Sequence, residues 1–367
     1  MNKTLLFLLI INTLDLYTME NECLLCELTK QEAYEQRFPV IEKTEHWTVA
    51  INILSQLRGS VLLIPSRCIK SFADLLPAEL ETYRNLIIKY QDLLHQDTKL
   101  GAFNTGWQED SHHIYVECAV RSPNDAGAIK ALLQRSVATR NPRIFYRKMC
   151  ELQNIPQEEI ADRTSGETDS TTLPSFKFFD KRDKDPRRAH HFDSSDRETH
   201  MAAYTAPTQK KKPTECFFCK DIERGIDAKG SPLVHVEDHA CACVSIGSYA
   251  DPHLLYFPKD HHGMFSSLSR KDGMAFLEMN QKCLWVLQRH HDKLGTYLPQ
   301  PATDSFIQEG VGSGATVPIH LHGQVVLETE PPEGIVATYY DPKKPKRDLG
   351  KIRTILRKGF EEEFSHH

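Results

Sequence analysis

The stretch Thr316–Val326, TVPIHLHGQVV, decides the expected fold, because it places His320, His322 and Gln324 at alternating positions inside an aliphatic run. Side chains alternate between the two faces of a β-strand, so these three polar residues share one face. A single histidine in an apolar run is commonly a hydrogen-bonded core residue. Three polar residues in strict alternation favour a functional site instead, and Gly323 marks a place where a backbone can approach a ligand closely.

The composition is that of a soluble globular protein. A chain of 367 residues is long enough for two or three domains, and 40% hydrophobic and 26% charged residues are ordinary values. The formal net charge of −5 is small, so composition gives no reason to expect a nucleic acid or an anionic membrane surface as partner. We expect a cytoplasmic protein.

The N-terminal residues 1–18 contain an apolar run, Leu5–Ile11, that is too short to span a bilayer. The run lies at the lower limit of a signal-peptide core, and no small-x-small cleavage site follows it. We expect residues 1–18 to be an extension or a weak signal, with the folded protein beginning near Met19. Secretion stays open as the alternative to a cytoplasmic location.

The chain contains an internal repeat with an offset of 193 residues. This offset relates the pair Cys23 and Cys26, in ECLLC, to the pair Cys216 and Cys219, in ECFFC. The same offset relates Cys68 to His261, and each of these follows an apolar run that ends in proline. Residues 77–96 and 269–294 then show apolar residues at helical spacing. A strand-like segment that contains two histidines follows each helix: SHHIYVECAV, residues 111–120, in the first half and PIHLHGQVVL, residues 318–327, in the second.

The repeated spacing predicts two metal sites. Cys₃His and Cys₂His₂ are standard tetrahedral zinc sets, and two C-x-x-C pairs with equal downstream spacing are a specific signal. Buried free thiols without metal are the alternative interpretation. The predicted zinc ligands are Cys23, Cys26, Cys68 and His113 in the first half, with His112 as a rival to His113, and Cys216, Cys219, His261 and His320 in the second half.

The motif HLHGQ at residues 320–324 resembles the histidine-triad (HIT) superfamily and, within it, the galactose-1-phosphate uridylyltransferase branch. The segment FIQEGVGSGATVP, residues 306–318, is similar to the phosphate-facing loop of that family. The resemblance covers both halves and implies two tandem HIT-like domains of the α+β class. Each domain is expected to be an antiparallel sheet with flanking helices, and the two are expected to form an intramolecular pseudo-dimer.

The resemblance implies a nucleotidyltransferase that works through a covalent nucleotidyl-histidine and uses a nucleotide or nucleotide sugar. It makes His322 the nucleophile, His320 the adjoining zinc ligand and Gln324 a hydrogen-bond donor to the phosphoryl group. Neutral imidazole is a competent nucleophile near pH 7, which agrees with this role. The expected nucleotide-binding and phosphate-binding residues are Gln308, Gly312, Ser313, Gly314, Thr316 and Gly323. A dinucleoside polyphosphate phosphorylase or hydrolase, and a non-catalytic zinc-stabilised nucleotide-binding or scaffold protein, are the alternatives.

The first half carries different residues at the reactive positions. Aligning His113 with His320 places Tyr115 opposite His322 and Glu117 opposite Gln324, and neither replacement suits nucleotidyl transfer. We therefore expect residues 19–150 to form a catalytically inactive, zinc-binding HIT-like domain, and 214–335 to form the catalytic one. Residues 151–213 are expected to be a linker, and 336–367 a basic helix and tail that packs on the protein. Further homodimerisation is possible in this scheme.

Overall fold

The computed structural model describes ten segments of the chain: residues 40–51, 60–99, 101–108, 113–121, 142–156, 216–245, 252–294, 303–309, 320–327 and 348–364. Residues 1–18 and most of the expected linker, 157–213, lie outside the described residues. None of the described helices is long and apolar enough to cross a membrane.

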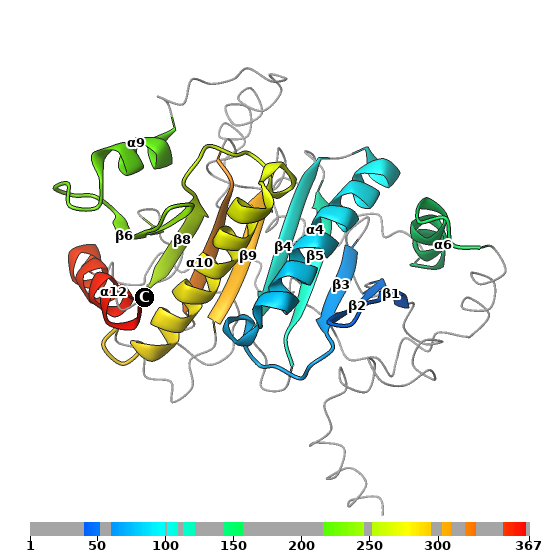
Figure 1. The fold of residues 1–367 in the computed structure, drawn as a ribbon, viewed down its shortest axis with the longest axis horizontal. Coiled ribbons are helices and arrows are strands. Elements are labelled where there is room, and N and C mark those ends of the chain that lie inside the picture. The colour runs from blue at the N-terminus through cyan, green and yellow to red at the C-terminus, as the bar shows by residue number, and fades with distance from the viewer. Residues whose placement is uncertain are drawn as a thin grey trace, which may run out of the picture.

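One antiparallel sheet of ten strands forms the centre of the structure (Figure 1), in the order β1-β2-β3-β5-β4-β9-β10-β8-β7-β6. Its first five strands are β1 (Val40–Lys43), β2 (Trp47–Ile51), β3 (Ser60–Pro65), β4 (Ala102–Gln108) and β5 (Tyr115–Arg121). The second five are β6 (Leu233–Val236), β7 (Ala240–Val244), β8 (His253–Pro258), β9 (Thr303–Glu309) and β10 (His322–Leu327). The two halves of the order are mirror-related through the central pair β4 and β9, as an intramolecular pseudo-dimer requires.

The strand registers confirm the internal repeat residue by residue. Trp47 pairs with Pro65 between β2 and β3, and Ala240 pairs with Pro258 between β7 and β8, which is the same pairing moved by 193 residues. The register irregularity between β1 and β2 also recurs at the same offset between β6 and β7. On the strands that carry the histidines, Glu117 lies opposite Leu62, and Gln324 lies opposite Leu255.

Two long helices, α4 (Pro77–Thr98) and α10 (Arg270–Arg289), lie side by side on one face of the sheet (Figure 1). Proline begins α4, where its missing N–H costs nothing, and Glu79 accepts a hydrogen bond from the Leu76 N–H at 2.7 Å. In α10 the side chain of Ser269 accepts the N–H of Asp272 at 3.1 Å. Each helix follows a 3₁₀ turn, η1 (Phe72–Asp74) or η5 (Phe265–Ser267). Both helices confirm the ones predicted from the apolar spacing.

Three shorter helices flank this framework. The helix α6 (Pro142–Leu152) packs on β1, β2 and α4, and α12 (Leu349–Phe364) packs on the equivalent elements β6, β7 and α10. Arg357 of α12 donates to the carbonyl of Leu233 at 2.9 Å, and Phe360 is fully buried. The C-terminal helix therefore packs against the second half of the sheet. The remaining helix, α9 (Phe217–Arg224), carries the second cysteine pair.

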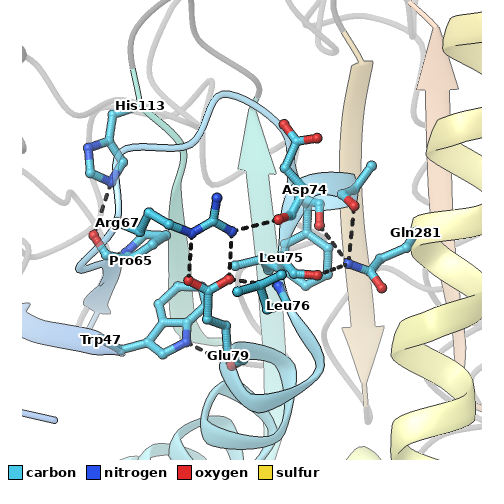
Figure 2. Close-up of polar contacts among 11 residues, drawn as sticks. Trp47, Pro65, Arg67, Asp74, Leu75, Leu76, Glu79, His113 and Gln281 are labelled. Atoms are coloured by element: carbon cyan, nitrogen blue, oxygen red, sulfur yellow. Dashed lines mark hydrogen bonds and ion pairs between the residues drawn. The ribbon is translucent and has the colours of Figure 1, made fainter. Parts of the chain in front are cut away.

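Contacts between side chains and backbone join the two halves on the helix-covered face. Gln281 of α10 donates from Nε2 to the carbonyls of Phe72 and Leu75, at 3.1 and 2.9 Å, in the first half (Figure 2). Glu309 of β9 accepts from the Phe265 N–H at 2.6 Å and from Gln91 of α4. Burial raises the pKa of Glu309 to about 7. The two halves thus share one sheet and one core.

Alternation along the strands separates the chemistry of the two sheet faces. Val61, Leu63, Val116 and Val325 belong to the apolar core under α4 and α10. Residues an odd number of positions away on the same strand, including His322 and Gln324 on β10, take the opposite face. The expected α+β class, an antiparallel sheet with flanking helices, is confirmed.

Candidate active site and metal centre

Four of the predicted zinc ligands meet in the second half. Cys216 lies at the N-cap of α9, Cys219 lies one turn on, His261 follows β8, and His320 lies just before β10. Their donor atoms all lie within 4.8 Å of one another. The sulfur of Cys216 is 3.3 Å from His320 Nδ1, and that of Cys219 is 3.3 Å from His261 Nδ1.

The chemistry of this donor set fits a metal ion held by two thiolates and two imidazoles. His320 donates from Nε2 to the carbonyl of Pro258 at 2.9 Å, which leaves Nδ1 facing the cysteines with its lone pair free for a metal. Burial lowers the pKa of His320 to about 4, so its ring is neutral near pH 7, as a ligand must be. Cys216 and His320 are each 1% exposed, whereas His261 is exposed, so an ion can enter from the His261 side.

His322 lies two residues beyond this centre and has one ring nitrogen assigned to the backbone. Its Nδ1–H donates to the carbonyl of His320 at 3.0 Å, so Nε2 carries the lone pair. The side chain is buried, and burial lowers its pKa below the ordinary imidazole value. The geometry therefore holds a neutral imidazole with a fixed tautomer.

Phe218, between the two cysteines, connects the metal centre to His322. Its ring centroid is 5.4 Å from those of both His320 and His322, and it stacks on Phe257 at 4.3 Å. The short helix that supplies two of the candidate metal ligands thus also supports the His322 ring. The sequence shows an aromatic pair inside C-x-x-C, but its contact with the histidine strand appears only in the fold.

Gln324 has a buried neighbour that sequence reasoning missed, His253 at the start of β8. The two side chains share a sheet face and are 2% and 1% exposed, and a hydrogen bond links them. Burial lowers the pKa of His253 to about 3, so it is neutral and can fix the direction of the Gln324 amide. The offset of 193 residues relates His253 to Ser60, whose hydroxyl donates to Glu117, the counterpart of Gln324. Following the repeat one strand further would have found this pair.

Gly323 has a packing role on the opposite face of β10. A Cβ atom placed on this residue would lie 2.0 Å from Cζ of Tyr256, whose ring crosses directly over the glycine. The absence of a side chain is thus explained by the Tyr256 ring. A backbone contact of Gly323 with phosphate stays a prediction.

The other predicted phosphate-binding residues fall on or beyond β9. Gln308 lies directly opposite His322 in the register of β9 and β10. The loop residues lie outside the described part of the chain, namely Gly312, Ser313, Gly314 and Thr316.

The first half keeps part of the metal-site geometry. His113 donates from Nε2 to the carbonyl of Pro65 at 3.0 Å (Figure 2), the same contact that His320 makes with Pro258. Cys68 is exposed. The other predicted ligands, Cys23 and Cys26, and the rival His112 lie outside the described residues, so a second metal site stays a prediction.

The fold can be compared with those of known proteins. No family model and no curated sequence matches the chain. Similar solved structures include a uridylyltransferase, 10% identical, covering 82% of this chain and 75% of that one with a TM-score of 0.45. An ADP-glucose phosphorylase from Arabidopsis thaliana with bound ADP-glucose is 11% identical and covers 85% of this chain and 82% of its own, with a TM-score of 0.44. A zinc-bound histidine triad family protein from Mycobacterium smegmatis is 16% identical over 42% of this chain and all of its own, with a TM-score of 0.33.

Proposed function

We propose that this chain is a nucleotidyltransferase of the galactose-1-phosphate uridylyltransferase type, in which His322 carries a nucleoside monophosphate between two phosphates. The observation that supports the proposal best is the His322 ring, buried and neutral, with Nδ1–H given to the His320 carbonyl and Nε2 left as the nucleophilic atom. Such a ring is a pre-oriented nucleophile that needs no separate base.

In the first step, Nε2 of His322 attacks the α-phosphorus of a nucleoside diphosphate sugar. The Nε2–P bond forms, and the bond from that phosphorus to the bridging oxygen breaks, so the sugar 1-phosphate leaves with the electron pair. The Nδ1 proton stays on the ring, whose positive charge is stabilised by the His320 carbonyl. In the second step an oxygen of an acceptor phosphate attacks the phosphorus, the P–N bond breaks, and its electrons return to Nε2.

Gln324 acts on the phosphoryl group in both steps. Its amide donates a hydrogen bond to phosphoryl oxygens, on which charge builds as the bonds exchange. Unlike a third histidine, an amide cannot protonate a leaving group, which favours transfer to an acceptor over hydrolysis. The hydrogen bond to His253 keeps the amide orientation fixed.

The proposed cofactor is zinc, held by Cys216, Cys219, His261 and His320 in the second half. When bound, the ion supplies a rigid cross-link rather than a reactive water, because the protein offers it four ligands. That cross-link ties α9 and its Phe218 to the strand that carries His322. A second ion in the first half is part of the proposal.

Intact mass spectrometry tests the proposed function. Zinc-loaded protein is mixed separately with UDP-glucose, ADP-glucose, ATP, GTP and diadenosine tetraphosphate, beside His322→Ala. One nucleoside monophosphate added to the wild type alone is the expected result, and its mass identifies the base. Discharge by hexose 1-phosphate identifies a transferase, and discharge by inorganic phosphate identifies a phosphorylase. No adduct with any of them, on protein that holds its zinc, would refute the covalent mechanism and favour a binding protein.

A further inference from the structure

Beside His322, the sheet face is apolar towards β8 and β7. Towards β8 and β7, the His322 ring meets Phe218, which stacks on Phe257, and buried Cys241 and Cys243 continue the same apolar cluster. An anionic group bound at His322 finds no strong hydrogen-bond donor among these side chains.

In the other direction, the cross-strand row runs from β10 through β9 to β4, across the junction of the two halves. His322 lies opposite Gln308 of β9, and Gln308 lies opposite Asn104 of β4, which belongs to the first half. Residues directly opposite each other in an antiparallel sheet have their side chains on the same face. Asn104 therefore shares the face of His322 although the two belong to different repeats.

The spacing suits a second phosphate. Two strand spacings separate the backbones of His322 and Asn104, about 10 Å. The His322 imidazole at one end and the Asn104 carboxamide at the other can bridge that distance through two linked phosphoryl groups of the ligand. On β4 and β5 the neighbours of Asn104 on this face, Ala102, Gly106 and Ala119, have no polar side chain, so Asn104 supplies the carboxamide on that side of β9. Its side chain is buried, 2% exposed.

A carboxylate also occurs on this face of the first half. Glu117 lies opposite Gly106 and accepts a hydrogen bond from Ser60 of β3, the strand on the side away from β9. That hydrogen bond holds one carboxylate oxygen of Glu117 towards the outer part of the first half. Asn104, in contrast, is the residue of the first half that belongs to the same cross-strand row as His322.

We propose that Asn104 completes the acceptor subsite of the second half by donating a hydrogen bond from its carboxamide to the phosphate of the acceptor. This inference rests on the proposed function and names the part of the site that accepts the nucleotide. The ligand class is a phosphate monoester such as a sugar 1-phosphate. The catalytically inactive repeat then contributes to binding in the active one.

The test uses the full-length, zinc-loaded chain with Asn104→Ala, Asn104→Asp and the control Thr105→Ala. Thr105 is the next residue on the same strand and equally buried, but it faces the helices and donates to the sulfur of Cys118 at 3.7 Å. Calorimetry measures binding of α-glucose 1-phosphate and of inorganic phosphate, and intact mass measures the His322 adduct and its discharge by acceptor.

A hydrogen bond to a charged group is worth enough that we expect Asn104→Ala to weaken both ligands at least 10-fold. Asn104→Asp weakens them further by charge repulsion, and Thr105→Ala changes binding less than 2-fold. The acceptor KM rises in the Asn104 variants while the amount of adduct formed at saturating donor stays the same.

Equal losses in Asn104→Ala and Thr105→Ala, or unchanged binding in Asn104→Ala, would overturn the inference. So would a loss confined to glucose 1-phosphate, since the contact would then be to the sugar. If the wild type forms no adduct but Asn104→Ala still weakens both ligands, the subsite stands and the proposed mechanism falls. If the adduct forms but acceptor binding does not depend on Asn104, the mechanism stands and the subsite falls.

Discussion

The contact between Gly323 and Tyr256 gives a prediction whose size follows from the repeat. Position 323 faces position 256 across β10 and β8, and the equivalent pair in the first half is Val116 facing Leu63. The second half pairs a glycine with the large Tyr256 ring, and the first half pairs two aliphatic side chains of intermediate size, Val116 and Leu63. We expect the double substitution Gly323→Val with Tyr256→Leu to import the first-half pair and to be tolerated better than either single change.

The single substitutions fail for opposite reasons. A Cβ on Gly323 would lie 2.0 Å from Cζ and 2.4 Å from Cε1 of Tyr256, and that ring cannot withdraw because it is fully buried against Phe276, 4.7 Å away. Overpacking of this kind costs about 3 kcal/mol, at the upper end of measured cases. Tyr256→Leu leaves a cavity that costs about 2 kcal/mol. If the sites were independent the double variant would lose about 5 kcal/mol, whereas a volume-conserving exchange loses less than about 1.5 kcal/mol.

Urea unfolding of zinc-loaded wild type, both single variants and the double variant measures the coupling energy, expected to be about 3 kcal/mol or more in favour of the double variant. Gly101→Ala is the matched control, because a Cβ there meets no atom within 4 Å. We expect it to change the unfolding free energy by less than about 1 kcal/mol. Additive losses in the double variant would show that the two positions are not in contact, and the register behind the repeat would be wrong.

Three further predictions concern the metal, the amide and a buried acid. Cys216→Ser lowers the zinc content by one ion per chain in elemental analysis and abolishes adduct formation. The control Cys241→Ser removes a buried thiol outside the ligand set and retains both the zinc and the adduct. Equal zinc in the two variants refutes the assignment. His253→Ala slows nucleotidyl transfer roughly 10-fold in single-turnover kinetics, because a buried hydrogen bond to Gln324 is lost, while zinc content stays unchanged. Glu309 has a folded-state pKa of about 7, above the unfolded value near 4.3, so the folded state binds the extra proton and stability falls as pH rises from about 4.3 to 7. The fall is up to about 4 kcal/mol over the whole range, and Glu309→Gln should flatten it in unfolding experiments from pH 5 to 8. An unchanged slope refutes the assignment.

The strongest sequence signals were those with strict spacing. Cys216, Cys219, His261 and His320 are far apart in the chain but are fixed by an offset that recurs in the other half, and the structure brings them within one ligand sphere. The alternation in HLHGQ likewise placed His322 and Gln324 on one face. Such patterns are readable because metal geometry and strand pleating each impose a period on the sequence.

Contacts between side chains on different strands leave no regular spacing in the sequence, so they could not be predicted from it. His253 lies on a strand that the repeat had identified, yet its role depends on the register that sets it beside Gln324. Gly323 has two physical explanations in the sequence, close ligand approach and close packing, and the Tyr256 ring accounts for it in the fold. Asn104 stood in a segment that the sequence linked only to strand formation, and its place in the His322 row depends on the pairing of β4 with β9.

That central pairing gives the first half a structural role in the second. Without the first half, β9 would be an exposed edge strand with unpaired N–H and C=O groups, one strand away from the nucleophile. Gln281 of α10 would lose the η1 carbonyls it binds, and Glu309 would lose Gln91 and gain water. Tyr115 and Glu117 lie away from these contacts, whereas β4 and α4 make them. The shared sheet therefore ties the strand beside His322 to residues from both repeats.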